Sequence, residues 1–158
     1  VEKHDVEHAF INLGWNVLVN GNKVDGSPWK IGIQDPRKGQ GEVMAIIDAV
    51  DLTIVTSGNY ERYFEEGDKL YHHILDPKTG YPAENNLLSV SIISKNSFDA
   101  DALSTAVYIM GREKGMKFIE NLKEVEVMFI TKNLDVYFSS GLDEIVEITN
   151  SDFNLVKE

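Results

Sequence analysis

The sequence predicts an α+β domain in which a mostly antiparallel β-sheet comes first and a pair of helices comes late. Short runs rich in β-branched and aromatic residues, separated by Gly, Pro and Asn turn signals, fill the earlier part of the chain. The apolar period then lengthens to that of a helix at residues 98–110. A chain of 158 residues is large enough for one domain with its own hydrophobic core.

The strands are expected wherever a β-type run lies between two turn signals. These runs are residues 9–13, 16–20, 29–34, 43–50, 52–56, 70–75, 87–94, 125–131 and 136–138. Gly14 marks a bend between the first two runs, and Asn20-Gly21 is a strong hairpin signal with residues 29–34 as its returning strand. Ser57-Gly58 is expected to end the strand that begins at residue 52.

Two helices follow the strand at residues 87–94. The first is expected at Phe98–Met110, with Ser97 or Asp99 as its N-terminal cap, and Gly111 ends it. Residues 112–122 form the second. The apolar face of the first helix is expected to consist of Ala102, Leu103, Ala106, Val107 and Met110. A closing hairpin, formed by the last two predicted strands, completes the domain.

Composition narrows the function. The chain has 15 basic and 26 acidic residues, a formal charge of −11, which argues against unassisted binding to nucleic acid or to anionic membranes. It contains no cysteine, which excludes disulfides, thiolate chemistry and cysteine-ligated zinc. No run is long enough for a transmembrane helix. An anionic ligand would therefore need local devices, such as backbone N–H groups or a metal ion.

The segment Tyr71–Pro82 has the most specific local pattern. Asp76-Pro77 opens a turn, because Pro fixes its backbone angle and Asp can accept hydrogen bonds from the N–H groups that follow. Gly80 supplies a left-handed residue, and a second proline stops the strand from continuing far. A loop specified in this way holds polar groups in fixed places, so it is a candidate part of a site.

His72 and His73 precede this turn, and adjacent residues of a strand point to opposite faces. One histidine is expected to face a cleft and the other to face solvent or a neighbouring sheet. A histidine in a cleft can act as a general acid or base, or it can donate a hydrogen bond to a phosphate. The residues alone leave open that both are ordinary strand histidines.

Two further features could bind a ligand. Asp101 and Thr105 are four residues apart on the predicted helix, so a carboxylate and a hydroxyl share one side and offer hard oxygen ligands to Mg²⁺. Alternatively, Asp101 favours the helix dipole and Thr105 simply packs. Ser57-Gly58 could present backbone N–H groups to an anion, although a plain turn is the more ordinary interpretation.

Four segments, in order, carry a resemblance to a known family, and Ser139–Leu142 adds a weaker fifth. They are Asn12-Leu13-Gly14-Trp15-Asn16, Thr56-Ser57-Gly58-Asn59-Tyr60, His73–Pro82 and Ala100-Asp101-Ala102-Leu103-Ser104-Thr105-Ala106. The ordered set resembles the ApbE family, the flavin transferases also called FAD:protein FMN transferases. The pattern departs from this chain at Trp15, where the family usually has a second glycine.

The resemblance implies Mg²⁺-dependent cleavage of FAD and transfer of its FMN half to a Thr or Ser of an acceptor flavoprotein. It implies that Asp101 and Thr105 are metal ligands and that Ser57, Gly58 and His73 lie along the FAD pocket. Asp101 and His73 are the candidates for the base that assists the acceptor hydroxyl. Two alternatives stay open: an Mg²⁺-dependent FAD pyrophosphatase that gives FMN and AMP, and a non-catalytic flavin- or protein-binding module.

Members of the family are much longer than this chain, and their upstream half supplies much of the FAD pocket. Residues 1–158 are therefore expected to be the C-terminal portion of such a transferase domain, and to bind FAD weakly when alone. The resemblance also implies a place in the cell envelope. Membrane attachment would then depend on an N-terminal anchor that is not among these residues.

Overall fold

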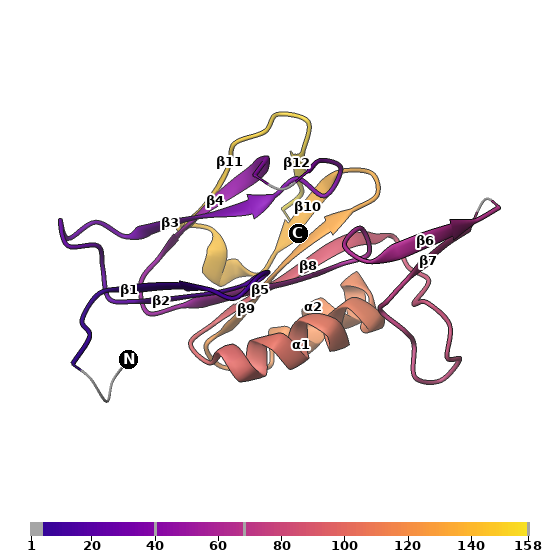
Figure 1. Cartoon of the computed structure of the whole chain (residues 1–158), viewed down its shortest axis with the longest axis horizontal. Helices are drawn as coiled ribbons and strands as arrows, with labels where there is room; N and C mark the ends of the chain where they lie inside the picture. Colours follow the sequence, from indigo (N-terminus) through magenta and orange to yellow (C-terminus); the bar gives the residue numbers. More distant parts are fainter. Residues whose placement is uncertain (1–4, 40, 68, 158) are drawn as a thin grey trace.

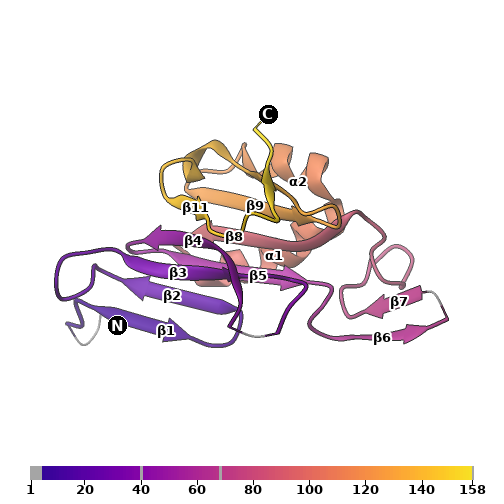
Figure 2. The ribbon, with the colours of Figure 1, turned by 90° about the horizontal axis from the view of Figure 1, so that it is seen from above.

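The computed structural model describes residues 5–39, 41–67 and 69–157, and it confirms the α+β class. The domain has three layers (Figure 1). Helices α1 (Ser97–Met110) and α2 (Arg112–Ile119) lie against one face of a seven-stranded sheet, and a three-stranded sheet covers the other face. A two-stranded hairpin projects from the body of the molecule, as Figure 2 shows from above.

The large sheet forms the central layer. Its neighbouring strands are antiparallel except for the parallel pair β10–β12. Its spatial order is β1 (Ala9–Asn12), β2 (Asn16–Asn20), β5 (Thr53–Gly58), β8 (Leu87–Ser94), β9 (Val125–Thr131), β10 (Asp135–Phe138) and β12 (Asn154–Leu155). The small sheet has the order β11 (Val146–Ile148), β4 (Val43–Ala49) and β3 (Trp29–Gln34), and the projecting hairpin consists of β6 (Tyr63–Glu66) and β7 (Lys69–His72).

Strands β5, β8 and β9 are buried on both faces, which explains their continuous apolar runs. Successive side chains of β9 enter two different cores. Met128 and Ile130 pack with the small sheet, whereas Val127 and Phe129 pack with the helices. The large sheet therefore joins both cores and fixes the position of α1 on its outer face.

The bend expected at Gly14 is confirmed as a two-residue turn between β1 and β2. The Leu13 N–H donates to the Asn16 carbonyl oxygen at 2.9 Å, and both central residues are left-handed, with φ of 69° at Gly14 and 48° at Trp15. This is the type I′ geometry that suits the twist of a hairpin. Trp15 thus occupies a backbone conformation that costs an ordinary side chain about 1 kcal/mol and that glycine adopts freely.

The hairpin predicted at Asn20-Gly21 is wrong. Strand β2 pairs with β1 and β5, whereas β3 pairs with β4 in the other sheet. Gly21 is left-handed, and its N–H donates to Asp51 Oδ1 at 2.6 Å, so the chain leaves the large sheet at this point. Trp29 Nε1 then donates to the Gly21 carbonyl oxygen. A turn signal is local and does not specify which sheet the next strand joins.

The cap and the buried face of α1 also differ from expectation. Asn96, rather than Ser97 or Asp99, caps the helix, because its side-chain oxygen accepts from the two N–H groups at residues 98 and 99. The residues that face the sheet are Ala100, Ser104, Val107 and Tyr108, while Ala102 and Met110 are exposed. A serine can lie in this face because its hydroxyl finds partners there, so the apolar pattern alone misplaced the buried stripe.

The other differences concern strand ends and short strands. Strand β7 ends at His72 rather than at residue 75, and β6, β11 and β12 were not predicted. Helix α2 ends at Ile119 rather than at residue 122, where a turn replaces it. The hairpin of β9 and β10 is confirmed by its antiparallel register. The predicted elements thus survive with shifted ends, and the additions are all short.

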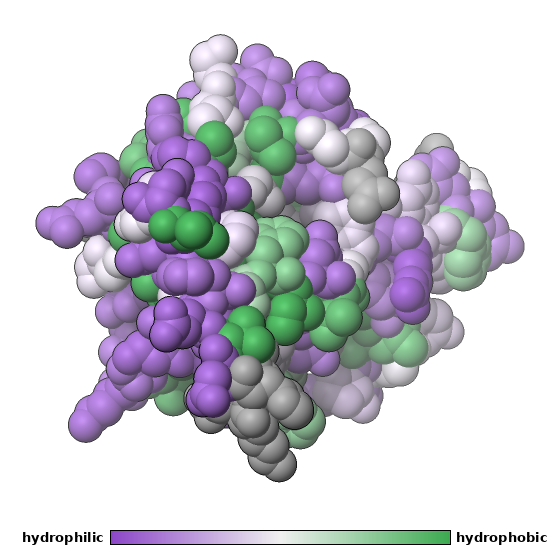
Figure 3. All heavy atoms as spheres, turned by 60° about the vertical axis from the view of Figure 1, so that its left-hand side comes forward, coloured by the Kyte–Doolittle hydropathy of each residue, from purple (hydrophilic) through white to green (hydrophobic). Residues whose placement is uncertain are grey.

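Figure 3 shows the face at the left of Figure 1, where hydrophilic residues predominate and hydrophobic ones gather near the centre. Exposed apolar side chains of the molecule include Phe10, Leu13 and Val24. Within the described part of the chain, no helix combines the length and the apolar character needed to cross a membrane.

Candidate functional site

Ser57 and Gly58 lie inside a strand, so the turn expected there is wrong. Both belong to β5, where they pair with Val90 and Ser89 of β8. Their backbone takes part in the sheet, so the two residues belong to a strand rather than to a loop. Gly58 is buried, and a Cβ at this position would lie 2.4 Å from a ring carbon of Tyr60. The glycine therefore lets the Tyr60 ring cover the end of the strand.

Ser57 instead brings β5 and α1 together through hydroxyl groups. Its Oγ lies 2.9 Å from Ser104 Oγ and 3.2 Å from Thr105 Oγ1. Ser104 Oγ in turn donates to the backbone carbonyl oxygen of Asp101 at 2.9 Å. Ser104 is 1% exposed, whereas Thr105 and Asp101 are exposed. The hydroxyl cluster therefore runs from the buried face of the helix to its surface.

Asp101 and Thr105 present a carboxylate and a hydroxyl on one side of α1, one turn apart, as their spacing predicts. Among the residues that the structure describes, no donor or cation pairs with the Asp101 carboxylate. The donor set is hard oxygen, which fits Mg²⁺. It is also incomplete, because the described residues contain no cluster of three His, Cys, Asp or Glu side chains able to hold a metal.

The tight turn predicted after His73 is confirmed. The Asp76 carboxylate accepts from the Lys78 N–H at 2.8 Å, and the Asp76 carbonyl oxygen accepts from the Gly80 N–H at 2.8 Å. Gly80 is left-handed, with φ of 72°. An isolated bridge between Leu75 and Pro82 closes the loop. The loop is therefore fixed by its own hydrogen bonds rather than by burial.

The two adjacent histidines have different environments. His72 is 7% exposed and packs edge-on against Tyr108 of α1, with ring centroids 5.8 Å apart. Burial lowers its pKa, so it is neutral at physiological pH, and no described group pairs with its Nδ1. His73 is exposed. The structure thus gives His72 a packing position and leaves His73 accessible to a ligand.

His73 is oriented by one carbonyl group. Its ring Nδ1 lies 3.2 Å from the carbonyl oxygen of Arg62, which also accepts from the His73 backbone N–H. Because a carbonyl oxygen can only accept, Nδ1 carries the ring hydrogen. In the neutral ring, Nε2 is then left as an acceptor. This tautomer suits a proton acceptor better than a donor to a phosphate.

His73 borders a cavity of about 510 Å³ beside the projecting hairpin. Its walls are Arg62, Tyr63, Phe64, Tyr71, His72, His73, Leu75, Gly80, Tyr81 and Pro82. Neither Ser57 nor the metal-ligand candidates of α1 belong to these walls. The structure therefore brings Ser57 and Thr105 together, whereas His73 lines a cavity that neither of them borders. A ligand that contacts both must extend from the cavity to α1.

Sequence reasoning missed two residues of this region. Ser104 is one, since a serine between Leu103 and Thr105 gives no sign of the partners it will meet. Glu61 is the other. Burial raises its pKa to about 7, and no described group pairs with its Oε1. It lies in the short connection between β5, which carries Ser57, and β6, which borders the cavity.

Comparison with known sequences identifies relatives of one family. The ApbE family pattern matches residues 1–129. A protein of Klebsiella pneumoniae (strain 342) named FAD:protein FMN transferase is 39% identical over 140 residues, which are 89% of this chain and 42% of that protein. A protein of the same name from Treponema pallidum (strain Nichols) is 37% identical over 161 residues, covering 96% and 44%. The chain spans less than half the length of these relatives.

Solved structures that resemble this domain come from the same family. The ApbE protein of Thermotoga maritima matches with a TM-score of 0.78 and 35% identity, over 87% of this chain and 44% of that one. The flavin transferase ApbE of Vibrio cholerae matches with a TM-score of 0.75 and 33% identity, over 91% and 46%. The likeness thus covers sequence and architecture together.

Proposed function

The chain belongs to the ApbE family, and from this premise we propose that it forms part of an Mg²⁺-dependent flavin transferase. The proposed reaction moves FMN from FAD to a Thr or Ser hydroxyl of an acceptor flavoprotein. Relatives and structural neighbours named as FAD:protein FMN transferase or flavin transferase support the reaction class. The names of these relatives do not specify a metal ion or an acceptor hydroxyl, and we add both here.

One observation supports the metal most directly. The Asp101 carboxylate is exposed and has no partner among the described residues, and the Thr105 hydroxyl lies one turn away on the same side of α1. A free carboxylate beside an oriented hydroxyl is the donor chemistry that Mg²⁺ prefers. Asp101 and Thr105 would hold the ion, and waters, carbonyl groups or substrate phosphates would supply the other ligands. Bound Mg²⁺ would neutralise the charge of the pyrophosphate.

The covalent step exchanges one P–O bond for another. The acceptor oxygen bonds to the phosphorus of the FMN half, and the bond from that phosphorus to the bridging oxygen breaks. AMP leaves with the bridging oxygen, and the hydroxyl proton passes to a base. His73 is a candidate for that base, because Nδ1 donates to the Arg62 carbonyl oxygen and Nε2 is free to accept. Asp101 is the other candidate.

The experiment uses the complete gene product, FAD, Mg²⁺ and an acceptor flavoprotein, and it follows fluorescence of the denatured acceptor together with AMP release. Wild type should yield a covalent flavin adduct, and Asp101→Ala should remove it. Asp99→Ala, which removes another exposed carboxylate from the first turn of the same helix, is the matched control and should retain it. An adduct that survives Asp101→Ala contradicts the metal assignment.

The other outcomes identify the alternatives. AMP and free FMN without an adduct would show a pyrophosphatase. FAD binding without either product would show a non-catalytic binding module. Both results would contradict the transferase proposal.

A further inference from the structure

The hydroxyl groups between α1 and β5 form a chain whose direction can be worked out. Ser104 Oγ lies 2.9 Å from the Asp101 carbonyl oxygen, and that oxygen can only accept. Ser104 therefore donates its single hydroxyl hydrogen to Asp101. The contact of 2.9 Å between Ser104 Oγ and Ser57 Oγ then needs its hydrogen from Ser57.

The same reasoning reaches Thr105. The single hydroxyl hydrogen of Ser57 is used toward Ser104, so the 3.2 Å contact between Ser57 Oγ and Thr105 Oγ1 takes its hydrogen from Thr105. The Thr105 hydroxyl thus donates inward, toward β5. Its remaining lone pairs are available on the exposed side of the helix, where the Asp101 carboxylate also lies.

We propose that Ser57 and Ser104 are positioning residues. They hold the Thr105 hydroxyl so that a lone pair of its oxygen can bind a divalent metal ion. This inference rests on the proposed function, and it assigns to Ser57 a task different from direct contact with FAD. The order of donors runs from Thr105 to Ser57, then to Ser104, and ends at the Asp101 backbone. Partners behind a metal ligand fix its orientation in many sites.

The three hydroxyl groups of Thr105, Ser57 and Ser104, called the relay below, lie in rigid surroundings. Ser104 is 1% exposed and lies in the buried stripe of α1. Ser57 belongs to a strand that is paired with β8 through Val90. The relay therefore joins two elements of the packed core, and the fold itself sets its geometry.

A second pair of hydroxyl groups in this protein provides a matched control for the relay. Thr56, the neighbour of Ser57 on β5, forms a hydroxyl contact of 2.8 Å with Ser91 of β8. Adjacent residues of a strand point to opposite faces, so this second pair lies away from α1. Removing the Thr56 hydroxyl costs a similar hydrogen bond, and it leaves the relay to Thr105 intact.

The first measurement needs no metal. Three-bond couplings between the Thr105 methyl carbon and the backbone nitrogen and carbonyl carbon report the side-chain rotamer by NMR. Wild type and Thr56→Val should show a single rotamer, whereas Ser57→Ala should show an average of several. Ser104→Ala should keep the Thr105 rotamer, because Ser57 is still present. Without Ser104, however, the Ser57 hydroxyl hydrogen has no fixed acceptor, so the Thr105 hydroxyl no longer has to donate to Ser57.

The second measurement titrates the protein with Mn²⁺, a hard divalent ion that prefers oxygen ligands, and follows free Mn²⁺ by EPR. Ser57→Ala should weaken binding about tenfold, the lower end of the effect of losing an orienting partner. Ser104→Ala should weaken it less, and Thr56→Val should stay within about twofold of wild type, since its hydroxyl lies outside the relay. In a Thr105→Val background, Ser57→Ala should have no further effect.

Each failure has a distinct meaning. A fixed Thr105 rotamer in Ser57→Ala, or unchanged Mn²⁺ affinity in that variant, overturns the relay. An added loss in the Thr105→Val background also overturns it, since Ser57 would then act independently of Thr105. Absence of Mn²⁺ binding by wild type overturns both this inference and the metal site. Normal Mn²⁺ binding without flavin transfer contradicts only the proposed function.

Discussion

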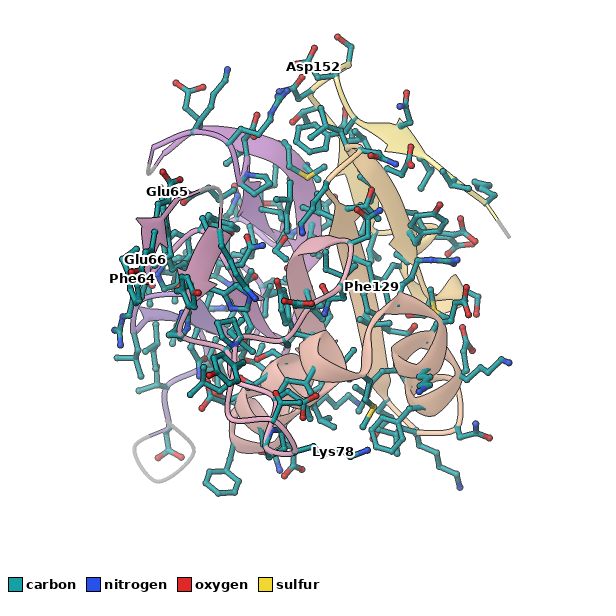
Figure 4. The ribbon with its side chains drawn as sticks, turned by 90° about the vertical axis from the view of Figure 1, so that its right-hand side faces the viewer. Phe64, Glu65, Glu66, Lys78, Phe129 and Asp152 are labelled. Atoms are coloured by element: carbon teal, nitrogen blue, oxygen red, sulfur yellow. The ribbon has the colours of Figure 1, made fainter. Side chains whose placement is uncertain are left out.

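Helix α1 and the β6–β7 hairpin support the candidate site in opposite ways. Helix α1 lies on the large sheet above a core that includes Phe129, which is fully buried. The hairpin has all four residues of β6 exposed, and its Phe64 is 61% exposed. Figure 4 shows Phe129 within the body of the molecule and Phe64, Glu65 and Glu66 at its edge.

The difference shows that the two parts of the site obtain their geometry from different sources. The ligand candidates on α1 are fixed by a packed core. His73 is fixed by local contacts: the Arg62 carbonyl oxygen, the hydrogen-bonded turn after it, and the stacking of Phe64 on Tyr71 at 5.0 Å. An isolated two-stranded hairpin has little stability in water. The hydroxyl cluster should therefore resist disturbance better than the cavity.

The largest expected effect tests the packed side. Phe129→Ala should lower the free energy of unfolding by about 3–5 kcal/mol, because it removes a buried ring and leaves a cavity between the sheet and the helices. Urea denaturation followed by circular dichroism measures it. A loss below about 1 kcal/mol would show that the core under α1 is loosely packed and would remove the contrast with the hairpin.

An intermediate effect is expected at Glu61, in the connection between β5 and β6. Glu61→Gln should raise the free energy of unfolding by about 1 kcal/mol at pH 8, since the carboxylate is partly buried without a partner and solvent screens part of its penalty. Near pH 4 the variant and wild type should be equally stable. Urea denaturation of both proteins across this range gives the difference.

The sign follows from the direction of the shift. Burial raises the Glu61 pKa to about 7, from 4.5. As pH rises through this window, the unfolded chain loses the proton before the folded one does, so Glu61 reduces stability progressively, and the reduction is complete above pH 7. Glutamine removes that dependence. A difference between variant and wild type that is constant with pH would show that the folded carboxyl ionises normally.

The smallest effect concerns the hairpin. Phe64→Ala should cost only about 0.5–1 kcal/mol, the value of one aromatic pair, because most of the ring is already in water. Its local effect should be larger than its global one. Hydrogen exchange should accelerate at the β6–β7 amides and not at those of β8 and β9. Uniform acceleration would mean that the hairpin is part of the cooperative core.

The sequence predicted most elements because their signals are local. The runs that became β2, β3, β8 and β9 have the predicted bounds, and α1 differs by one residue. What could not be predicted is which elements meet. Asn20-Gly21 indicates a turn, but the next strand joins another sheet because Gly21 is anchored to Asp51, thirty residues away.

The candidate site shows the same limit. The spacing of Asp101 and Thr105 predicts that they share one side of a helix, and the structure agrees. Nothing in the sequence near Ser57 indicates that its hydroxyl meets Ser104, which is 47 residues away. Ser57-Gly58 has the composition of a turn, yet the register with β8 holds it in a strand. Long-range pairing decided both outcomes.

One ion-pair cluster has a consequence for how this chain is made. Arg37, after β3, binds the buried Asp35 at 2.7 Å and also binds Asp152 at 2.9 Å, 115 positions later; Asp152 is labelled in Figure 4. Strand β11 likewise reaches back to β4. During synthesis, β3 and β4 therefore leave the ribosome long before their partners and expose an apolar face that includes Ile31 and Met44. That interval is when a chaperone has most reason to bind the nascent chain.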